Sequence, residues 1–258
     1  MSSSRDTVSE IELREVHKSF RVDGRLMTAL GGTSVSARKG EFVVIIGPSG
    51  CGKSTLLNIV CGLMEPDAGE VLLDGRPVLD RTGLLGYMLQ KDLLLPWRKV
   101  LDNVILGPEI IGTDRKEARE EARRLIPLFG LEGFEDSYPD ALSGGMRQRA
   151  ALLRTFLCGR SAMLLDEPFG ALDALTRRQL QQWLLSVWSQ FRQTIIFVTH
   201  DMDEAVYLAD WVYVMTPRPG RIRLEMEIPL GRPRLPEMMT SGQFGALKGE
   251  LLAALEAQ

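Results

Sequence analysis

One short stretch restricts the possible fold more than any other part of the chain. Phe42–Ile46 is a continuous, mostly β-branched apolar run that ends at Gly47. Such a run is typical of a strand that is buried on both faces of a parallel sheet. Small residues follow as far as Gly52, and a helix is then predicted over residues 52–62. A buried strand, a glycine-rich loop and a helix in direct succession predict an α/β fold.

The glycine-rich loop has the composition of an anion-binding site. Its small residues allow consecutive backbone N–H groups to turn toward one point, and the following helix adds the positive end of its dipole. Lys53 is expected to reach the β- and γ-phosphates of a nucleoside triphosphate, and the Ser54 hydroxyl to ligate Mg²⁺. A plain glycine-rich turn is the alternative. The expected phosphate ligands are Gly47, Pro48, Ser49, Gly50, Cys51, Gly52, Lys53, Ser54 and Thr55.

A second apolar strand, predicted over residues 162–165, ends in the carboxylates Asp166 and Glu167. Ligands of open α/β folds bind at the carboxyl ends of the strands. Because adjacent residues on a strand point in opposite directions, only one of the pair is expected to face a metal. We assign Asp166 to Mg²⁺, directly or through water, and Glu167 to the attacking water as a base or polarising group. A solvated strand end is the alternative interpretation.

The sequence Leu-Ser-Gly-Gly-Met-Arg-Gln over residues 142–148 starts another predicted helix. A serine and small residues at a helix start form a second anion site on a chain that already has one. A common serine N-cap is the alternative, but a Gly-Gly pair lowers helix stability and therefore requires a reason. The expected ligands in this stretch are Ser143, Gly144, Gly145 and Gln148.

Along the sequence, the glycine-rich loop comes first, the Leu-Ser-Gly-Gly segment second and the acidic pair third. Gln90 lies between the first two, and Thr199-His200-Asp201 follows the third. This arrangement resembles the ATP-binding subunit of ATP-binding cassette (ABC) transporters. The resemblance extends over about residues 11–226. It implies an α/β fold with a P-loop (RecA-like) core and parallel sheet, an antiparallel β lobe and an inserted α-helical lobe. It also implies ATP and Mg²⁺ as cofactors and a head-to-tail dimer with a second copy of the chain. Ser143 and Gly145 would then touch the γ-phosphate held by Lys53 of the second copy.

The resemblance assigns roles to further residues. Gln90 corresponds to a glutamine that senses Mg²⁺ and the γ-phosphate and acts as the hinge between the lobes, and His200 to a histidine that bonds the γ-phosphate. The resemblance thus makes Glu167, His200, Lys53 and Gln90 the catalytic residues. Asp173 lies in a loop that crosses the dimer interface in this family. Phe20 would stack on adenine, although a core aromatic at a strand end is the alternative.

Two short segments point to a subfamily. Leu94-Leu95-Pro96-Trp97 and Asp173-Ala-Leu-Thr-Arg177 resemble subunits that serve nitrate, alkanesulfonate and taurine import. This resemblance implies a multi-spanning membrane permease, a periplasmic or lipid-anchored solute-binding protein and a small anionic solute. Pro96 disfavours helix at Leu95, and the aromatic Trp97 after it could present apolar surface to a partner. The resemblance implies that this region helps to form the groove that receives a short helix from the membrane subunit. Packing of Trp97 under the helical lobe is the alternative.

Periodicity and chain breakers organise the rest of the sequence. Asp23-Gly24 predicts a tight hairpin turn, and Asp114 with Thr113 predicts the N-cap of a helix over residues 115–126. Further strands are predicted at 70–73, 84–89, 194–199 and 211–215, and helices at 172–191, 202–209 and from Ser241. The predicted divisions are a flexible N-terminus (1–10), an ATP-binding domain (11–225) with a helical lobe (about 91–157), and a tail with a proline-rich link and an amphipathic helix (226–258).

Composition limits the cellular context. The chain of 258 residues is 45% hydrophobic and 25% charged, with a net charge of −3. Its apolar runs fall well short of the roughly 20 residues that a membrane helix needs, and its start lacks an apolar signal segment. We therefore expect a peripheral protein on the cytoplasmic side of the cell membrane, with no nucleic acid partner. The cysteines lack metal-ligand spacing, so no disulfide or zinc site is expected.

Competing functions make different predictions. A soluble ABC ATPase that acts on DNA or ribosomes usually carries a long coiled-coil insertion or a second cassette, and neither is present. A P-loop nucleoside kinase or GTPase would lack the Leu-Ser-Gly-Gly motif, and a GTPase would show an Asn/Thr-Lys-x-Asp motif that is absent here. Export stays open because the membrane partner sets the direction. The sequence leaves the transported solute, the permease and any regulation by the tail open.

Overall fold

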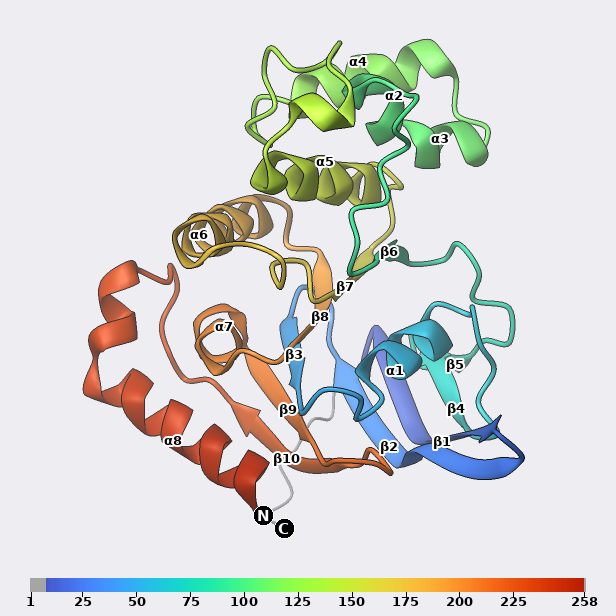
Figure 1. The fold of residues 1–258 in the computed structure, drawn as a ribbon, viewed down its shortest axis with the longest axis vertical. Helices are drawn as coiled ribbons and strands as arrows, with labels where there is room; N and C mark the ends of the chain where they lie inside the picture. The colour runs from blue at the N-terminus through green and yellow to red at the C-terminus, as the bar shows by residue number, and fades with distance from the viewer. Residues whose placement is uncertain (1–7, 258) are drawn as a thin grey trace. The chain divides into compact units, whose positions relative to one another are not determined.

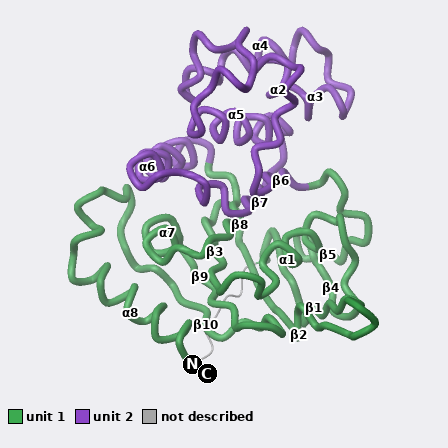
Figure 2. The backbone as a smooth tube through the Cα atoms, in the orientation of Figure 1, with its two compact units in different colours: residues 1–84, 192–258 green, residues 85–191 purple. Residues whose placement is uncertain are grey.

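The structure is a computed structural model in which residues 8–257 are described (Figure 1). The chain forms two compact units, which Figure 2 distinguishes by colour. Unit 1 comprises Met1–Leu84 and Arg192–Gln258, and unit 2 is the intervening segment Leu85–Phe191. Unit 1 is therefore assembled from two separate stretches of sequence. The predicted flexible N-terminus lies outside the described residues, except for residues 8–10.

An antiparallel sheet forms the first part of unit 1. Its long hairpin turns where predicted, because Val22 pairs with Arg25 across Asp23 and Gly24. Both turn residues have positive φ, at 49° and 75°, which glycine and aspartate tolerate better than most residues. The strand order is β2-β1-β4-β5. The strands are β1 (Ile11–Val22), β2 (Arg25–Ala37), β4 (Ala68–Leu73) and β5 (Arg76–Pro77).

The parallel strands of unit 1 surround the predicted central strand. Every residue of β3 (Phe42–Ile46) is buried, and β3 pairs in parallel with both β8 (Thr194–Thr199) and β9 (Trp211–Met215). The continuous apolar run therefore has the predicted cause, since both faces of the strand are covered. The strand β10 (Ile222–Glu227) pairs with β9 in the antiparallel direction.

Three helices of unit 1 follow these strands. The helix α1 (Lys53–Val60) comes directly after the glycine-rich loop, and α7 (Met202–Leu208) follows β8. The predicted tail helix is α8 (Gly242–Glu256), which Ser241 caps through the amide of Phe244. It lies against α7 (Figure 1). A short 3₁₀ helix, Pro236–Thr240, precedes α8. The buried side of α8 is made by Phe244, Leu247 and Leu251.

Unit 2 combines a pair of parallel strands with helices. Its strands pair with Tyr87 opposite Leu164. Asp114 caps α4 as predicted by accepting from the amides of Lys116 and Glu117. The strand predicted at 84–89 is shorter than expected. Unit 2 covers more of the sequence than the predicted helical lobe, which was about 91–157. The elements are β6 (Gly86–Met88), α2 (Val100–Val104), α3 (Leu106–Ile110), α4 (Arg115–Leu125), the 3₁₀ helix Pro139–Ala141, α5 (Gly144–Phe156), β7 (Ala162–Asp166) and α6 (Ala174–Phe191).

Over residues 8–257, no helix combines the length and the apolar character that crossing a membrane requires.

Candidate nucleotide site

The glycine-rich loop joins β3 to α1 by a backbone path that depends on glycine. Gly50 and Gly52 have φ values of 75° and 114°, in the left-handed region where side chains are disfavoured. Gly47 is crowded instead, because an added Cβ would lie 2.9 Å from the Cys51 sulfur and 3.0 Å from Cβ of Met215. The first helical bond runs from the Leu56 amide to the Gly52 carbonyl. The loop therefore enters α1 directly, as an anion-binding loop requires.

Lys53 lies inside this loop and not on the surface. Its side chain is 5% exposed, and its Nζ donates to the carbonyl oxygens of Gly47 at 2.8 Å and Pro48 at 3.2 Å. An ammonium group has three donors and no acceptor, so it can exchange these carbonyls for phosphate oxygens. Ser49, Gly50 and Ser54 are exposed. The loop thus presents backbone and hydroxyl groups outward with the lysine beneath them.

Cys51 contributes packing to the loop. Its side chain is buried, and this burial raises the pKa of the thiol above its ordinary value. The thiol is therefore neutral at physiological pH and is a poor nucleophile. Any phosphate contact made by Cys51 has to come from its backbone.

His200 is exposed and directly follows β8. The residues on both sides of it form hydrogen bonds. The Asp201 side chain caps α7 by accepting from the amides of Asp203 at 2.8 Å and Glu204 at 3.2 Å. On the other side, the Thr199 hydroxyl accepts from the Asp201 amide at 3.0 Å and donates to the buried Glu204 carboxylate. These bonds fix the backbone that carries His200.

Glu204 is a residue that motif reasoning missed. The sequence signal is the spacing Asp-x-x-Glu, which resembles a capping box at a helix start. Here the glutamate reaches Thr199.

The acidic pair in unit 2 lies at the end of β7. Asp166 is 4% exposed, whereas Glu167 is half-buried, so the two carboxylates differ in environment, as the alternation along a strand suggests. Glu167 has φ at 43°, a left-handed conformation that is uncommon for a residue with a side chain. Such backbone conformations are often found at functional sites. The turn closes with a bond from the Gly170 amide to the Glu167 carbonyl at 3.1 Å.

Gln90 is brought next to Glu167. Its Nε2 donates to Oε2 of Glu167 across 3.4 Å, and it comes shortly after β6, which pairs with β7. The structure therefore unites two of the predicted catalytic residues within unit 2. Because the amide nitrogen makes this contact, the amide oxygen of Gln90 remains the group that suits a metal.

Ser143 caps α5 and is exposed. Its hydroxyl accepts from the Met146 amide at 3.3 Å. The neighbouring glycines have a packing role within unit 2. A Cβ at Gly145 would lie 3.0 Å from Cγ2 of Thr176 in α6, and one at Gly144 would lie 3.3 Å from Leu172. The glycine pair therefore permits the close approach of neighbouring side chains within unit 2.

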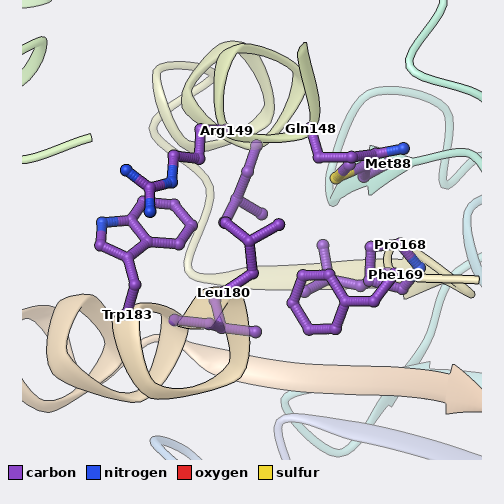
Figure 3. A pocket seen from close by; sticks show the side chains of 10 residues that line it. Met88, Gln148, Arg149, Pro168, Phe169, Leu180 and Trp183 are labelled. Carbon is purple, nitrogen blue, oxygen red and sulfur yellow. The ribbon is translucent and has the colours of Figure 1, made fainter. Parts of the chain in front are cut away.

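Gln148 has an unexpected position. Its side chain is 7% exposed and its Oε1 is buried without a hydrogen-bond partner among the described residues. It lines a small cavity together with Met88 and Phe169, while Arg149 lies over the indole of Trp183 at 5.1 Å (Figure 3). Its position inside unit 2 therefore gives no support to the predicted contact with nucleotide.

Asp173 and Phe20 are placed at the surface or close to it. Asp173 is exposed, and hydrogen bonds from the Thr176 hydroxyl and amide lower the pKa of its carboxyl. Phe20 is half-buried on β1, with the Lys18 ammonium 6.0 Å from its ring centroid. Both positions leave the side chains accessible, and their roles toward nucleotide stay predictions.

The loop and the core strands define a P-loop nucleotide-binding protein with an α/β fold. The family model described as ABC transporter matches residues 30–170. The chain belongs to the ABC transporter family of ATP-binding proteins, and it is an ATPase coupled to transport across a membrane.

Curated relatives resemble the chain over most of its length. An uncharacterized ABC transporter ATP-binding protein of Methanocaldococcus jannaschii is 47% identical over 87% of this chain and 84% of its own. A taurine import ATP-binding protein of Rhizobium johnstonii is 42% identical, with 91% of both chains covered. An aliphatic sulfonates import ATP-binding protein of Bacillus thuringiensis is 40% identical over 95% of this chain and 96% of its own.

Solved structures agree on the fold. A dimeric bacterial ABC transporter cassette matches with a TM-score of 0.74 and 31% identity over 86% of this chain and 100% of its own. A dimeric post-hydrolysis state of an ATP-binding cassette, bound to ADP and Pi, matches with a TM-score of 0.74 and 30% identity, with the same coverage. The predicted fold class, an α/β P-loop core with parallel and antiparallel strands and helices, is confirmed.

Proposed function

We propose that this chain energises a membrane permease that imports a small anionic solute of the taurine, sulfonate or nitrate type. The observation that carries the proposal is the similarity to relatives named for taurine and aliphatic sulfonate import over 91% and 95% of the chain. The Leu-Pro-Trp segment adds independent support from the sequence. The solute itself binds elsewhere in the system, so the chain's own chemistry is that of ATP.

The residues present fit ATP with Mg²⁺. Ser54, Asp166 and Gln90 offer a hydroxyl, a carboxylate and an amide oxygen, which are the hard oxygen donors that Mg²⁺ prefers. When bound, Mg²⁺ would neutralise charge on the β- and γ-phosphates. Lys53 and the loop amides hold the phosphates. Glu167 polarises the attacking water, and His200 bonds the γ-phosphate.

A second copy of the chain completes the ATP site in this proposal. The exposed Ser143 at the start of α5 is the group that would reach ATP held by the other copy. The similarity to dimeric cassettes supports this arrangement. ATP would thus close the dimer and hydrolysis would reopen it, and the permease would respond to this shift between states. A peripheral place on the cytoplasmic side of the membrane follows from that role.

Several large apolar side chains of unit 2 are exposed, which is compatible with a permease contact. Trp97 is 72% exposed and Ile110 is 77% exposed, and Leu93 and Ile111 are exposed as well. The alternative in which Trp97 packs under the helical lobe is therefore wrong. An apolar side chain that faces water is available for a contact with the permease, and Trp97 lies in the segment that resembles the import subunits.

A transport assay tests the proposal. In the native host, deletion of the gene is expected to abolish growth on taurine, on an alkanesulfonate or on nitrate as the sole source of sulfur or nitrogen. Wild-type protein should restore growth, and the Glu167→Gln variant should not. Trp97→Ala should lower the ATPase stimulation by the permease while leaving basal ATPase activity intact. Unchanged growth on all three solutes, with only DNA or ribosomes copurifying, would favour the soluble ABC ATPase instead.

A further inference from the structure

Residues 216–221, the segment that follows β9, pack against the phosphate loop. Its backbone is fixed to β2 at Gly220. The Gly220 amide donates to Ala29 at 2.8 Å, and the Gly220 carbonyl accepts from the Gly31 amide and the Thr33 hydroxyl, both at 2.9 Å. The segment is therefore a rigid extension of the antiparallel sheet.

The same segment packs directly on the loop backbone. A Cβ at Gly220 would lie 2.3 Å from the Cys51 carbonyl oxygen, so only glycine fits there. From the other side, a Cβ at Gly52 would lie 2.9 Å from Leu30 and 3.1 Å from the Ala29 carbonyl oxygen. The C-terminal half of the loop is thus held between this segment and β2.

Arg218 extends this contact to the exposed tip of the loop. Its Nε donates to the Gly50 carbonyl, and its Nη1 contacts the Met27 sulfur at 2.9 Å. Its Nη2 lies 3.3 Å from where a Cβ of Gly50 would stand. The guanidinium therefore rests on Gly50 while Arg218 itself is exposed.

Fixing the Gly50 carbonyl also fixes a backbone donor. The carbonyl of Gly50 and the amide of Cys51 belong to one planar peptide unit and point in opposite directions. A carbonyl held by Arg218 therefore sets the direction of the Cys51 amide, which donates to the Pro48 carbonyl at 3.3 Å and closes the turn at the tip of the loop. Lys53 holds the carbonyls of Gly47 and Pro48. When Lys53 turns to phosphate, Arg218 still holds Gly50.

We propose that Arg218 is a positioning residue for the phosphate loop, which keeps it in the conformation that binds the phosphates of ATP. The positive charge of Arg218 also favours an anionic ligand nearby. This inference depends on ATP binding by the family and not on the identity of the imported solute.

Substitution of Arg218 tests the proposal on the purified protein. For Arg218→Ala, the Kd for ATP, measured by equilibrium binding, and the KM for ATP are expected to rise about tenfold, the typical effect of losing a hydrogen bond to a charged group. The kcat at saturating ATP and the Tm should change little, because an exposed side chain contributes little to stability. Arg218→Lys keeps a charged donor and should recover part of the affinity.

Matched controls separate positioning from general destabilisation. Arg221→Ala removes an arginine of the same segment whose Nε lies 3.0 Å from a Cβ position at Gly31, in β2. It is expected to leave the KM for ATP unchanged. The proposal is overturned if Arg218→Ala binds ATP like the wild type, if Arg221→Ala weakens ATP binding equally, or if the loss follows a matching fall in Tm.

Discussion

At the scale of single residues, the functional side chains are held by contacts that differ in kind. Glu167 depends on an uncommon left-handed backbone conformation and on the amide of Gln90. Lys53 depends on burial and on carbonyls of its own loop. Because these contacts differ, replacing Lys53 or Glu167 with an uncharged residue should affect ATP binding and ATP hydrolysis to different extents.

Glu167→Gln is expected to bind ATP with wild-type affinity and to hydrolyse it at least about a hundredfold more slowly. General bases typically contribute that much, and an amide cannot accept the proton. ATPase turnover and ATP binding are measured side by side. Lys53→Ala is the matched control, since it should lose binding as well. Undiminished turnover of Glu167→Gln would reject the assignment.

Individual residues also mark how far the sequence can predict the site. Motif spacing predicts the loop, the acidic pair and Gln90 because their chemistry is local in sequence, and the structure places Gln90 beside Glu167. Gln148 was assigned to nucleotide although it shares a helical face with Gly145 and Leu152, which are both buried. Arg218 carried no local signal, because its partner Gly50 lies 168 positions away in sequence. Long-range contacts of this kind require the fold.

At the scale of elements, capping and apolar periodicity predict the longer helices, whereas α2 and α3 are not predicted individually. Asp114 caps α4 as predicted. Asp201 caps α7 although the sequence analysis did not assign it as a cap, and α6 starts at Ala174, later than predicted. β6 is shorter than its apolar run suggests. Apolar character alone does not fix strand ends, because burial by neighbouring elements decides which residues pair.

Close packing of α5 on α6 yields a stability prediction. Gly145→Ala should destabilise the protein by about 1 kcal/mol, since overpacking of a tight contact costs more than the gain in helix propensity. Thr176→Ser removes the methyl group that the new Cβ would meet. Denaturant unfolding of both single variants and of the double variant measures the effect. Failure of Thr176→Ser to restore stability would show that packing is not why glycine stands there.

The contact of α2 with α4 predicts a dependence on pH. Burial alone would raise the pKa of Asp102, but hydrogen bonds from Arg119 and Arg115 lower it overall. A lowered pKa in the folded state stabilises the protein above the unfolded value, near pH 4, and this stabilisation is lost as pH falls through the folded value.

Asp102→Asn should therefore lower the Tm at pH 7, and the difference from the wild type should shrink as pH falls below 4. Glu121→Gln removes one side of the exposed Arg124 pair and is the control, expected to change the Tm little. A difference between Asp102→Asn and the wild type that is constant with pH would contradict the argument.

At the scale of the whole molecule, the exposed Ser143 predicts an assembly that depends on ATP. Glu167→Gln should elute as a dimer from a sizing column with ATP and as a monomer with ADP. Ser143→Arg, added to Glu167→Gln, should prevent the dimer because a large cation fills the site. A protein that stays monomeric with ATP at all concentrations would contradict the head-to-tail arrangement.

The discontinuous make-up of unit 1 has a consequence for synthesis. On the ribosome, β3 emerges early, yet its described partners β8 and β9 end only at Thr199 and Met215. Until then the nascent chain carries an unpaired apolar strand, and such strands readily associate with other chains. The phosphate loop therefore cannot reach its final support until most of the chain has been translated. Premature termination before Met215 yields a product whose central strand has an open edge.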